Sequence, residues 1–296
     1  MASVPLAQRA ALASVATACF LLALKGYAAA ATGSVAMLGS LADTALDLVA
    51  SLVTLWGVRV AATPADDNHR FGHGKAEALA ALFQVALITL SAVGIGWRAI
   101  SRLLEGGGAA NAEYGIGVSV IALAATGLLI SYQRRILRQT GSIAIRADNV
   151  HYQSDLLLNG SVIAALILDQ YLGFSGADPV FGVLIALWLA WGAWGSAVSA
   201  IDQLMDKEWP EDRRQHFLTV AARHPELRGI HDLRTRTSGT RDFVQFHVDV
   251  APDMTVAEAH RVMEEVEDRL AQEFPGVEIL IHPDPQGWVR HSRPAS

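Results

Sequence analysis

Two pairs of residues of metal-binding types occur inside segments that are otherwise almost free of charge, and the two members of each pair stand four residues apart. Asp43 and Asp47 form one pair, and His151 and Asp155 form the other. A spacing of four places both side chains of a pair on one face of a helix. Two such pairs facing each other offer four oxygen and nitrogen ligands, which suits a tetrahedral ion such as Zn²⁺. The spacing therefore predicts a metal site between two helices.

Ionisable groups of this kind are costly in a bilayer, at roughly 2.5–3.5 kcal/mol per carboxylate on insertion scales. One alternative is a structural polar cluster, although Asn or Ser would hold helices together at lower cost. Another alternative is a proton path without metal. We favour metal binding coupled to proton exchange, because a divalent ion requires ionised carboxylates and a neutral imidazole, so its binding expels protons. A free imidazole has a pKa near 6.5, so a modest pH difference could switch His151.

Further polar residues follow the same two segments and predict that the two helices line a hydrated path: Ser40, Ser51, Thr54, Asp148 and Asn159.

Six apolar segments are each about long enough to cross a hydrocarbon core of ~30 Å as a helix. They cover residues 10–31, 34–58, 76–97, 114–131, 147–168 and 179–201. The chain has 296 residues, of which 18% are charged, but residues 1–205 hold only 11 of the 23 Lys and Arg and 12 of the 29 Asp and Glu. The rest has an ordinary soluble composition. We therefore expect a transmembrane domain over residues 1–206 and a soluble domain over residues 207–296.

The composition also excludes several classes of protein. The net charge of −6 argues against a nucleic-acid binder, and a single cysteine, Cys19, can form neither an internal disulfide nor a thiolate metal site. The chain contains no His-Glu-x-x-His helix and no nucleophile motif of a serine hydrolase, so we do not expect an enzyme. Small residues after Tyr27 resemble a signal-peptide end, but five further apolar segments favour an uncleaved first helix.

Basic residues in the loops predict the orientation. Lys and Arg concentrate between the second and third segments and between the fourth and fifth. Both termini, and with them the acidic C-terminal domain, should then be cytoplasmic.

Histidine and aspartate recur outside the membrane. Asp66, His69 and His73 stand three and four residues apart in the loop before the third segment, where they could bind a metal or simply be solvated. Seven of the ten histidines lie after residue 205. Five residues could converge on one or two cations if the strand order permits, although surface histidines are common: His231, His247, His260, His282 and Asp284.

The C-terminal domain is predicted to fold as α-β-β-α-β. Helices are expected over residues 211–223 and 256–274, and strands over 232–238, 243–250 and 277–282. Apolar residues alternate with polar ones from Val244 to Val250, so one face of that strand should be buried. Three strands and two helices make a small open-faced α/β sandwich.

The chain resembles the cation diffusion facilitator family, in its bacterial zinc and ferrous-iron efflux branch. The resemblance rests on Asp43-x-x-x-Asp47 with His151-x-x-x-Asp155, and on the loop from Asp66 to Glu77. It implies six transmembrane helices, a ferredoxin-like cytoplasmic domain and a homodimer in a bacterial inner membrane. It also implies a transport site at those four residues, a second site at Asp66, His69 and His73, and a binuclear site in the C-terminal domain at the five residues named above.

These expectations combine into one hypothesis: a proton-coupled antiporter that exports divalent cations, Zn²⁺ foremost, with Zn²⁺ also held in the cytoplasmic domain. Fe²⁺, Cd²⁺ and Co²⁺ remain alternatives, whereas His151 argues against Mg²⁺, which prefers oxygen ligands. The rival readings are a membrane-bound metal sensor and a passive divalent-cation channel.

Overall fold

Six long helices form the first part of the molecule. The computed structural model describes residues 5–32, 35–105, 116–172, 177–223, 227–239 and 241–287. Within these ranges the long helices are α1 (Leu6–Thr32), α2 (Val35–Ala61), α3 (Ala76–Glu105), α4 (Ile116–Thr140), α5 (Ile143–Leu172) and α6 (Ala177–Leu204). The expected starts of two segments, at residues 34 and 114, lie outside the described ranges. The chain divides into two compact units, residues 1–201 and 202–296, which we describe separately.

Five of these helices contain an apolar stretch long enough to cross a membrane, and α5 is the exception in the described chain. Its 30 residues would span about 45 Å at 1.5 Å each, but it carries the polar residues Asp148, His151 and Asp155. The predicted mostly helical membrane architecture is confirmed. Helix α5 therefore combines the length of a membrane span with the polar residues that could bind a metal.

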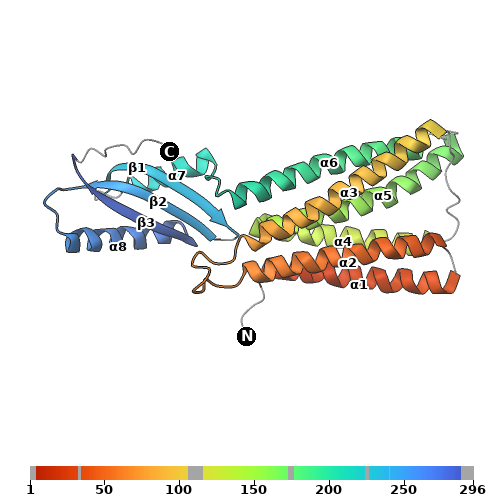
Figure 1. Ribbon diagram of the computed structural model, residues 1–296, viewed down its shortest axis with the longest axis horizontal. Helices are drawn as coiled ribbons and strands as arrows, with labels where there is room; N and C mark the ends of the chain where they lie inside the picture. Colours follow the sequence, from red (N-terminus) through yellow and green to blue (C-terminus); the bar gives the residue numbers. More distant parts are fainter. Residues whose placement is uncertain are drawn as a thin grey trace. The chain divides into compact units, whose positions relative to one another are not determined.

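Helix α5 packs against several others in the unit (Figure 1). It contacts α2, α3 and α4, while α1 packs on α2 and α4. Ile88 of α3 and Leu189 of α6 share an apolar cluster against which Val150 of α5 packs. This surrounded position allows side chains of α5 to reach partners on several neighbouring helices.

Helices α2 and α3 approach closely at Gly57. A Cβ added there would overlap the methyl group of Ala80 and lie 3.1 Å from the Ala76 carbonyl oxygen. Only glycine fits without displacing the backbone of α3. The contact fixes the start of α3 against the end of α2, on either side of the loop that carries Asp66.

The second unit contains helices α7 (Glu211–Ala221) and α8 (Val256–Glu273) and a three-stranded sheet. Strands β1 (Arg228–Ser238) and β2 (Arg241–Val250) pair antiparallel, and β3 (Val277–Pro285) pairs parallel to β2, in the order β1-β2-β3. The predicted α-β-β-α-β order is confirmed. Strand β1 starts four residues earlier than expected, so His231 lies inside the strand rather than at its opening.

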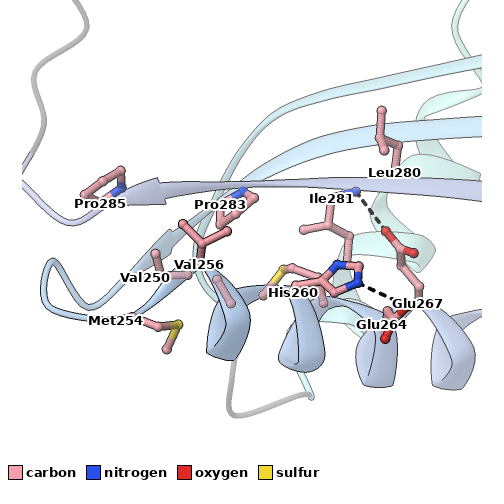
Figure 2. A pocket seen from close by; sticks show the side chains of 12 residues that line it. Val250, Met254, Val256, His260, Glu264, Glu267, Leu280, Ile281, Pro283 and Pro285 are labelled. Atoms are coloured by element: carbon pink, nitrogen blue, oxygen red, sulfur yellow. Dashed lines mark hydrogen bonds and ion pairs between the residues drawn. The ribbon is translucent and has the colours of Figure 1, made fainter.

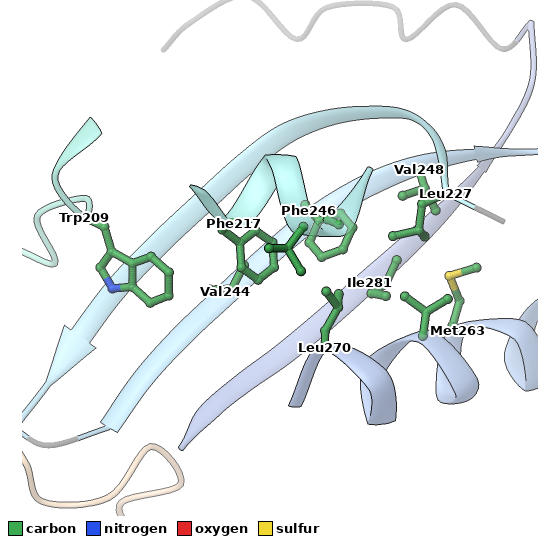
Figure 3. Packing of buried hydrophobic residues seen from close by; sticks show 12 residues of the cluster. Trp209, Phe217, Leu227, Val244, Phe246, Val248, Met263, Leu270 and Ile281 are labelled. Carbon is green, nitrogen blue, oxygen red and sulfur yellow. The ribbon is translucent and has the colours of Figure 1, made fainter. Parts of the chain in front are cut away.

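One face of the sheet carries the hydrophobic core (Figure 3). Val244, Phe246 and Val248 of β2 pack against Phe217 of α7 and Leu270 of α8. Thr255 and Glu258 cap the start of α8 with reciprocal hydrogen bonds. Because side chains alternate along a strand, the residues between those of the core lie on the opposite, open face.

Candidate metal sites

The first donor cluster lies between α2 and α5. Asp47, His151 and Asp155 each offer a ligand atom, and these atoms lie within 4.8 Å of one another. His151 Nε2 is 3.0 Å from Asp47 Oδ1. The side chains of Asp47 and His151 are 18% and 8% exposed. Carboxylate and imidazole groups at this separation are a suitable donor set for Zn²⁺ and similar ions.

Asp43 is the predicted ligand that this cluster does not include. It lies one turn before Asp47 on α2, and its side chain is exposed. Three of the four predicted ligands are therefore together, and the fourth lies one turn from Asp47 on α2. His151 retains a buried Nδ1 without a hydrogen-bond partner among the described residues, so one imidazole nitrogen is still available to a ligand.

A closed hydrogen-bonded network adjoins this cluster, centred on the fully buried carboxylate of Asp148. Ser14 Oγ donates to Asp148 Oδ2 over 2.6 Å and Gln133 Nε2 donates to the same oxygen over 2.7 Å. Gln84 Nε2 donates to Asp148 Oδ1 over 3.0 Å. The donors come from α1, α4 and α3, so one side chain of α5 joins four helices.

The same network includes residues that were predicted to line a hydrated path. Thr54 accepts a hydrogen bond from Gln84 over 2.9 Å, and Ser51 lies 2.8 Å from the hydroxyl of Tyr152. Ser51, Thr54 and Asp148 have no exposed surface. In this structure each of them hydrogen-bonds to side chains of neighbouring helices instead of facing an open path.

The second cluster is in the loop between α2 and α3. Asp66 Oδ2 is 3.4 Å from His73 Nε2, and Asp66 Oδ1 is 3.2 Å from His69 Nδ1. The backbone N–H of His69 donates to Asp66 Oδ1 over 2.7 Å and lowers the pKa of this carboxyl group. Gly72 allows the tight wrap with φ 77°. The loop thus places all three predicted donors together.

The third cluster crosses the open face of the sheet. His231, His247 and His282 are register partners on β1, β2 and β3. Asp284 Oδ2 is 2.9 Å from His247 Nδ1 and 3.3 Å from His231 Nε2, and Asp284 Oδ1 is 3.4 Å from His282 Nε2. One carboxylate therefore contacts three imidazoles, and His231, His247 and Asp284 meet the geometry of a metal site.

Asp232 is a neighbour of this cluster that the sequence did not reveal. Its Oδ2 lies 3.8 Å from His247 Nε2. Adjacent strand residues normally point to opposite faces, but β1 is irregular on both sides of His231, and Asp232 has φ 50°. A bulge of this kind leaves no signal in the apolar alternation.

His260 is the predicted donor that the structure separates from this cluster. It lies on α8, with Nε2 3.4 Å from Glu264 Oε1. Figure 2 shows it lining a groove between α8 and β3, with Glu264 and Glu267 nearby. The groove has a volume of about 520 Å³. Glu267 accepts a hydrogen bond from the N–H of Ile281, and burial raises the pKa of its carboxyl group. Within one copy of the chain, His260 is on the helix side of the sheet.

These features define a multi-pass membrane protein with imidazole and carboxylate donor clusters both within its helices and outside them. Residues 11–205 match the cation efflux transmembrane domain, and residues 209–286 match the cytoplasmic domain of cation efflux proteins. The chain belongs to the cation efflux family, the cation diffusion facilitators, whose members are transporters of divalent metal ions.

Relatives of similar length support the assignment. The cation-efflux pump FieF of Escherichia fergusonii is 41% identical over 280 residues, which is 95% of this chain and 93% of that protein. FieF of Yersinia pestis strain Pestoides F is 42% identical over 286 residues, covering 97% of this chain and 95% of that protein.

Solved structures align with about a quarter of this chain. A zinc form of CzrB, described as a zinc transporter, is 37% identical and covers 30% of this chain and 99% of that chain, with a TM-score of 0.26. The metal-bound C-terminal domain of the CzcD transporter from Thermotoga maritima is 26% identical, and the match covers 26% of this chain and 92% of that chain, with a TM-score of 0.25.

Proposed function

We propose that this chain exports Zn²⁺ from the cytoplasm in exchange for protons. The observation that carries the proposal is the cluster of Asp47, His151 and Asp155 between two long helices of a cation efflux protein. Asp43 supplies the fourth ligand from the preceding turn of α2. Residues 1–206 form the transport domain, and residues 207–296 form a cytoplasmic domain that binds metal and joins two copies.

Proton exchange follows from the chemistry of the donors. The carboxylates and the imidazole bind a divalent ion only when they are deprotonated. The same groups can therefore hold protons in one half of a cycle and metal in the other, which requires no ATP. Rocking of helices around a fixed site would expose it to each side of the membrane in turn, as in other secondary transporters.

The choice of metal is the least constrained part of the proposal. Imidazole with carboxylates accepts Zn²⁺, Fe²⁺, Cd²⁺ or Co²⁺, and the general affinity order does not decide among them. Zn²⁺ is the ion whose preferred tetrahedral geometry fits four protein ligands without added water. Mg²⁺ prefers oxygen ligands and retains water molecules.

The proposed location is a bacterial inner membrane, with both termini in the cytoplasm. Arg59, Arg70 and Lys75 lie between α2 and α3, and four arginines lie between Ser131 and Ala147 around the end of α4. Positive charge of this kind marks cytoplasmic loops. The C-terminal domain follows α6 and is therefore cytoplasmic in this orientation.

We further propose that the chain works as a homodimer and that Zn²⁺ in the C-terminal domain strengthens the pairing. His231, His247, His282 and Asp284 are already adjacent on one face of the sheet. His260 lies on the helix side, so it would join such a site only from a second copy.

The decisive experiment is Zn²⁺ flux in proteoliposomes with an imposed pH gradient. Asp47→Ala should abolish flux, since it removes a ligand from the membrane cluster. Asp67→Ala is the matched control, because that carboxylate is 95% exposed in the loop and should leave flux unchanged. Flux retained by Asp47→Ala would overturn the site assignment.

The same preparation separates the rival functions. An antiporter moves Zn²⁺ faster when a proton gradient drives protons in the opposite direction, and each transport of Zn²⁺ is accompanied by proton movement the other way. A passive channel would show flux that is insensitive to the proton gradient. A membrane-bound sensor would bind Zn²⁺ without flux, so each result identifies one class.

A further inference from the structure

Lys25 is a charged residue inside an apolar helix, and the function proposed above does not use it. It belongs to the stretch Leu6–Ala31 of α1, which is apolar enough to cross a membrane. Its Nζ donates a hydrogen bond to Thr44 Oγ1 on α2 over 2.7 Å. Thr44 is 1% exposed and itself donates to the carbonyl oxygen of Ser40 over 3.1 Å. A buried hydroxyl thus fixes the position of the ammonium group.

The position of this hydroxyl places the ammonium beside the metal cluster. Thr44 stands one residue after Asp43 and three before Asp47 on α2, and side chains three residues apart on a helix are neighbours, with about 5–6 Å between their Cβ atoms. The hydrogen bond goes to a neutral group rather than to a ligand carboxylate. The ammonium is therefore held near Asp47 by a bond that takes up no carboxylate oxygen of the cluster.

A purely structural role explains these contacts poorly. A lysine within the membrane is costly and usually marks an ion pathway or a counter-ion. Helix α1 is already joined to α4 and α5 by the hydrogen bonds of Ser14 with Gln133 and Asp148. A small polar residue would add one more such bond at lower cost.

We infer that Lys25 is a built-in counter-cation of the transport site. When the site is empty, the ammonium offsets the negative charge of Asp47 and Asp155. When a divalent ion is bound, the ammonium repels it, which lowers the affinity and speeds release. This inference rests on the proposed function, because it assigns Lys25 to the same site.

The test is the Zn²⁺ affinity of the full chain in detergent, measured by titration calorimetry at a pH where the ligands are ionised. Replacing His69, His73, His231 and His247 by Ala in every variant removes the other two clusters. In this background Lys25→Met should bind Zn²⁺ roughly tenfold more tightly, a difference of about 1.4 kcal/mol. Lys25→Arg keeps the charge and should match the parent.

Two controls separate charge from packing. Arg9→Met removes a cation from an exposed position of the same helix and should leave the affinity unchanged. Thr44→Val removes the anchoring hydroxyl but keeps the charge, so it should shift the affinity less than Lys25→Met. An equal or larger shift for Thr44→Val would show that helix packing sets the affinity and would overturn the inference.

Transport supplies a second readout. If release becomes slower, Lys25→Met should lower both KM and the maximal Zn²⁺ flux, a combination that general misfolding does not produce. Lys25→Gln is the substitute if the methionine variant does not fold. An unchanged or weaker affinity in both neutral variants overturns the inference even when wild-type flux is normal. Wild-type protein that binds Zn²⁺ without flux would instead overturn the proposed function and leave the affinity result standing.

Discussion

A single carboxylate sits at the centre of the histidine cluster in the C-terminal domain. The two oxygens of Asp284 contact His231, His247 and His282. In the absence of metal, this carboxylate is the group that orients all three rings. It is also the donor with a negative charge to offset a bound cation, so it should matter more than any one histidine.

We expect Asp284→Ala to weaken Zn²⁺ binding to this domain by roughly 10–100-fold, the range for loss of a group that both supports and orients ligands. The measurement is Zn²⁺ titration of the full chain with the membrane and loop clusters removed by substitution. His216→Ala is the control, because His216 packs against Phe274 away from this cluster. Equal affinity in the Asp284 variant and the parent would contradict the assignment.

Asp66 should show its lowered pKa in the pH dependence of the loop. Its ionised form accepts the backbone N–H groups of Asn68 and His69. A carboxyl group with a folded pKa below the unfolded value stabilises structure above the unfolded pKa, and this stabilisation is lost as pH falls through the folded pKa. The ordinary pKa of an Asp side chain is about 3.9. Protection of these two amides from hydrogen exchange should therefore persist below that pH.

Asp66→Asn should remove this pH dependence, because the amide side chain does not titrate. Asp67→Asn is the matched control, since its carboxylate pairs with Arg70 and not with the backbone of the turn. Protection that is lost at the same pH in wild type and Asp66→Asn would show that another group controls the loop.

At the scale of the helices, hydrogen bonds to the Asp148 side chain join α5 to α1, α3 and α4. Asp148 has neutral donors from three helices and is fully buried. Leaving one oxygen of such a group unpaired costs about 1–3 kcal/mol. Gln84→Met should therefore lower the stability of the membrane unit by this amount, as measured by thermal unfolding in detergent.

Thr89→Val provides the comparison on the same helix, because Thr89 is exposed and, among the described residues, its hydroxyl bonds only to the carbonyl of Val85 in its own helix. It should leave the unfolding temperature unchanged. Equal stability of Gln84→Met and wild type would mean that Asp148 finds other partners.

The close approach of α2 and α3 depends on a missing side chain. Gly57→Val should destabilise the unit by about 1–3 kcal/mol, the usual cost of overpacking, because any Cβ there overlaps Ala80. Gly127→Val tests the same change on α4, where nothing lies within 4 Å of an added Cβ. The first variant should unfold at a lower temperature than the second, and the reverse order would contradict the packing.

The spacing of residues along the chain predicts which donors share one face of a helix or strand. Which faces then meet depends on how the elements pack, and the sequence does not show this. His151 and Asp155 share a face because they are four residues apart on one helix, which the sequence states directly. Whether Asp43 joins them depends on the exposure of its turn of α2, and that depends on neighbouring helices. His247 and His282 could be placed on the open face by strand alternation, whereas the side on which α8 holds His260 could not. The bulge that admits Asp232 is likewise set by pairing between β1 and β2.

At the scale of the whole molecule, the separation of His260 from the other donors predicts an effect of metal on assembly. In detergent, the chain should have the molar mass of a dimer by light scattering. Ligand binding that favours one state stabilises it by roughly 2.7 kcal/mol at a hundredfold excess over Kd. Zn²⁺ should therefore shift dissociation to lower protein concentration, and a chelator should reverse the shift.

His260→Ala should reduce this effect of Zn²⁺ while leaving the metal-free dimer unchanged. His216→Ala again serves as the comparison. A monomer–dimer balance that does not respond to Zn²⁺ in wild-type protein would show that the dimer forms independently of these sites.

The pairing of β2 with β3 also bears on how the edge strand folds. His247 pairs with His282, and Phe246 pairs with Ile281, on opposite faces of the sheet. A slip of one residue would turn His282 and Asp284 into the hydrophobic core and bring Ile281 to the open face. An ion bound across these strands is compatible with one alignment only. Metal binding during folding would then stabilise only the domain with the correct β2–β3 register and so select it over domains in which the strands are misaligned.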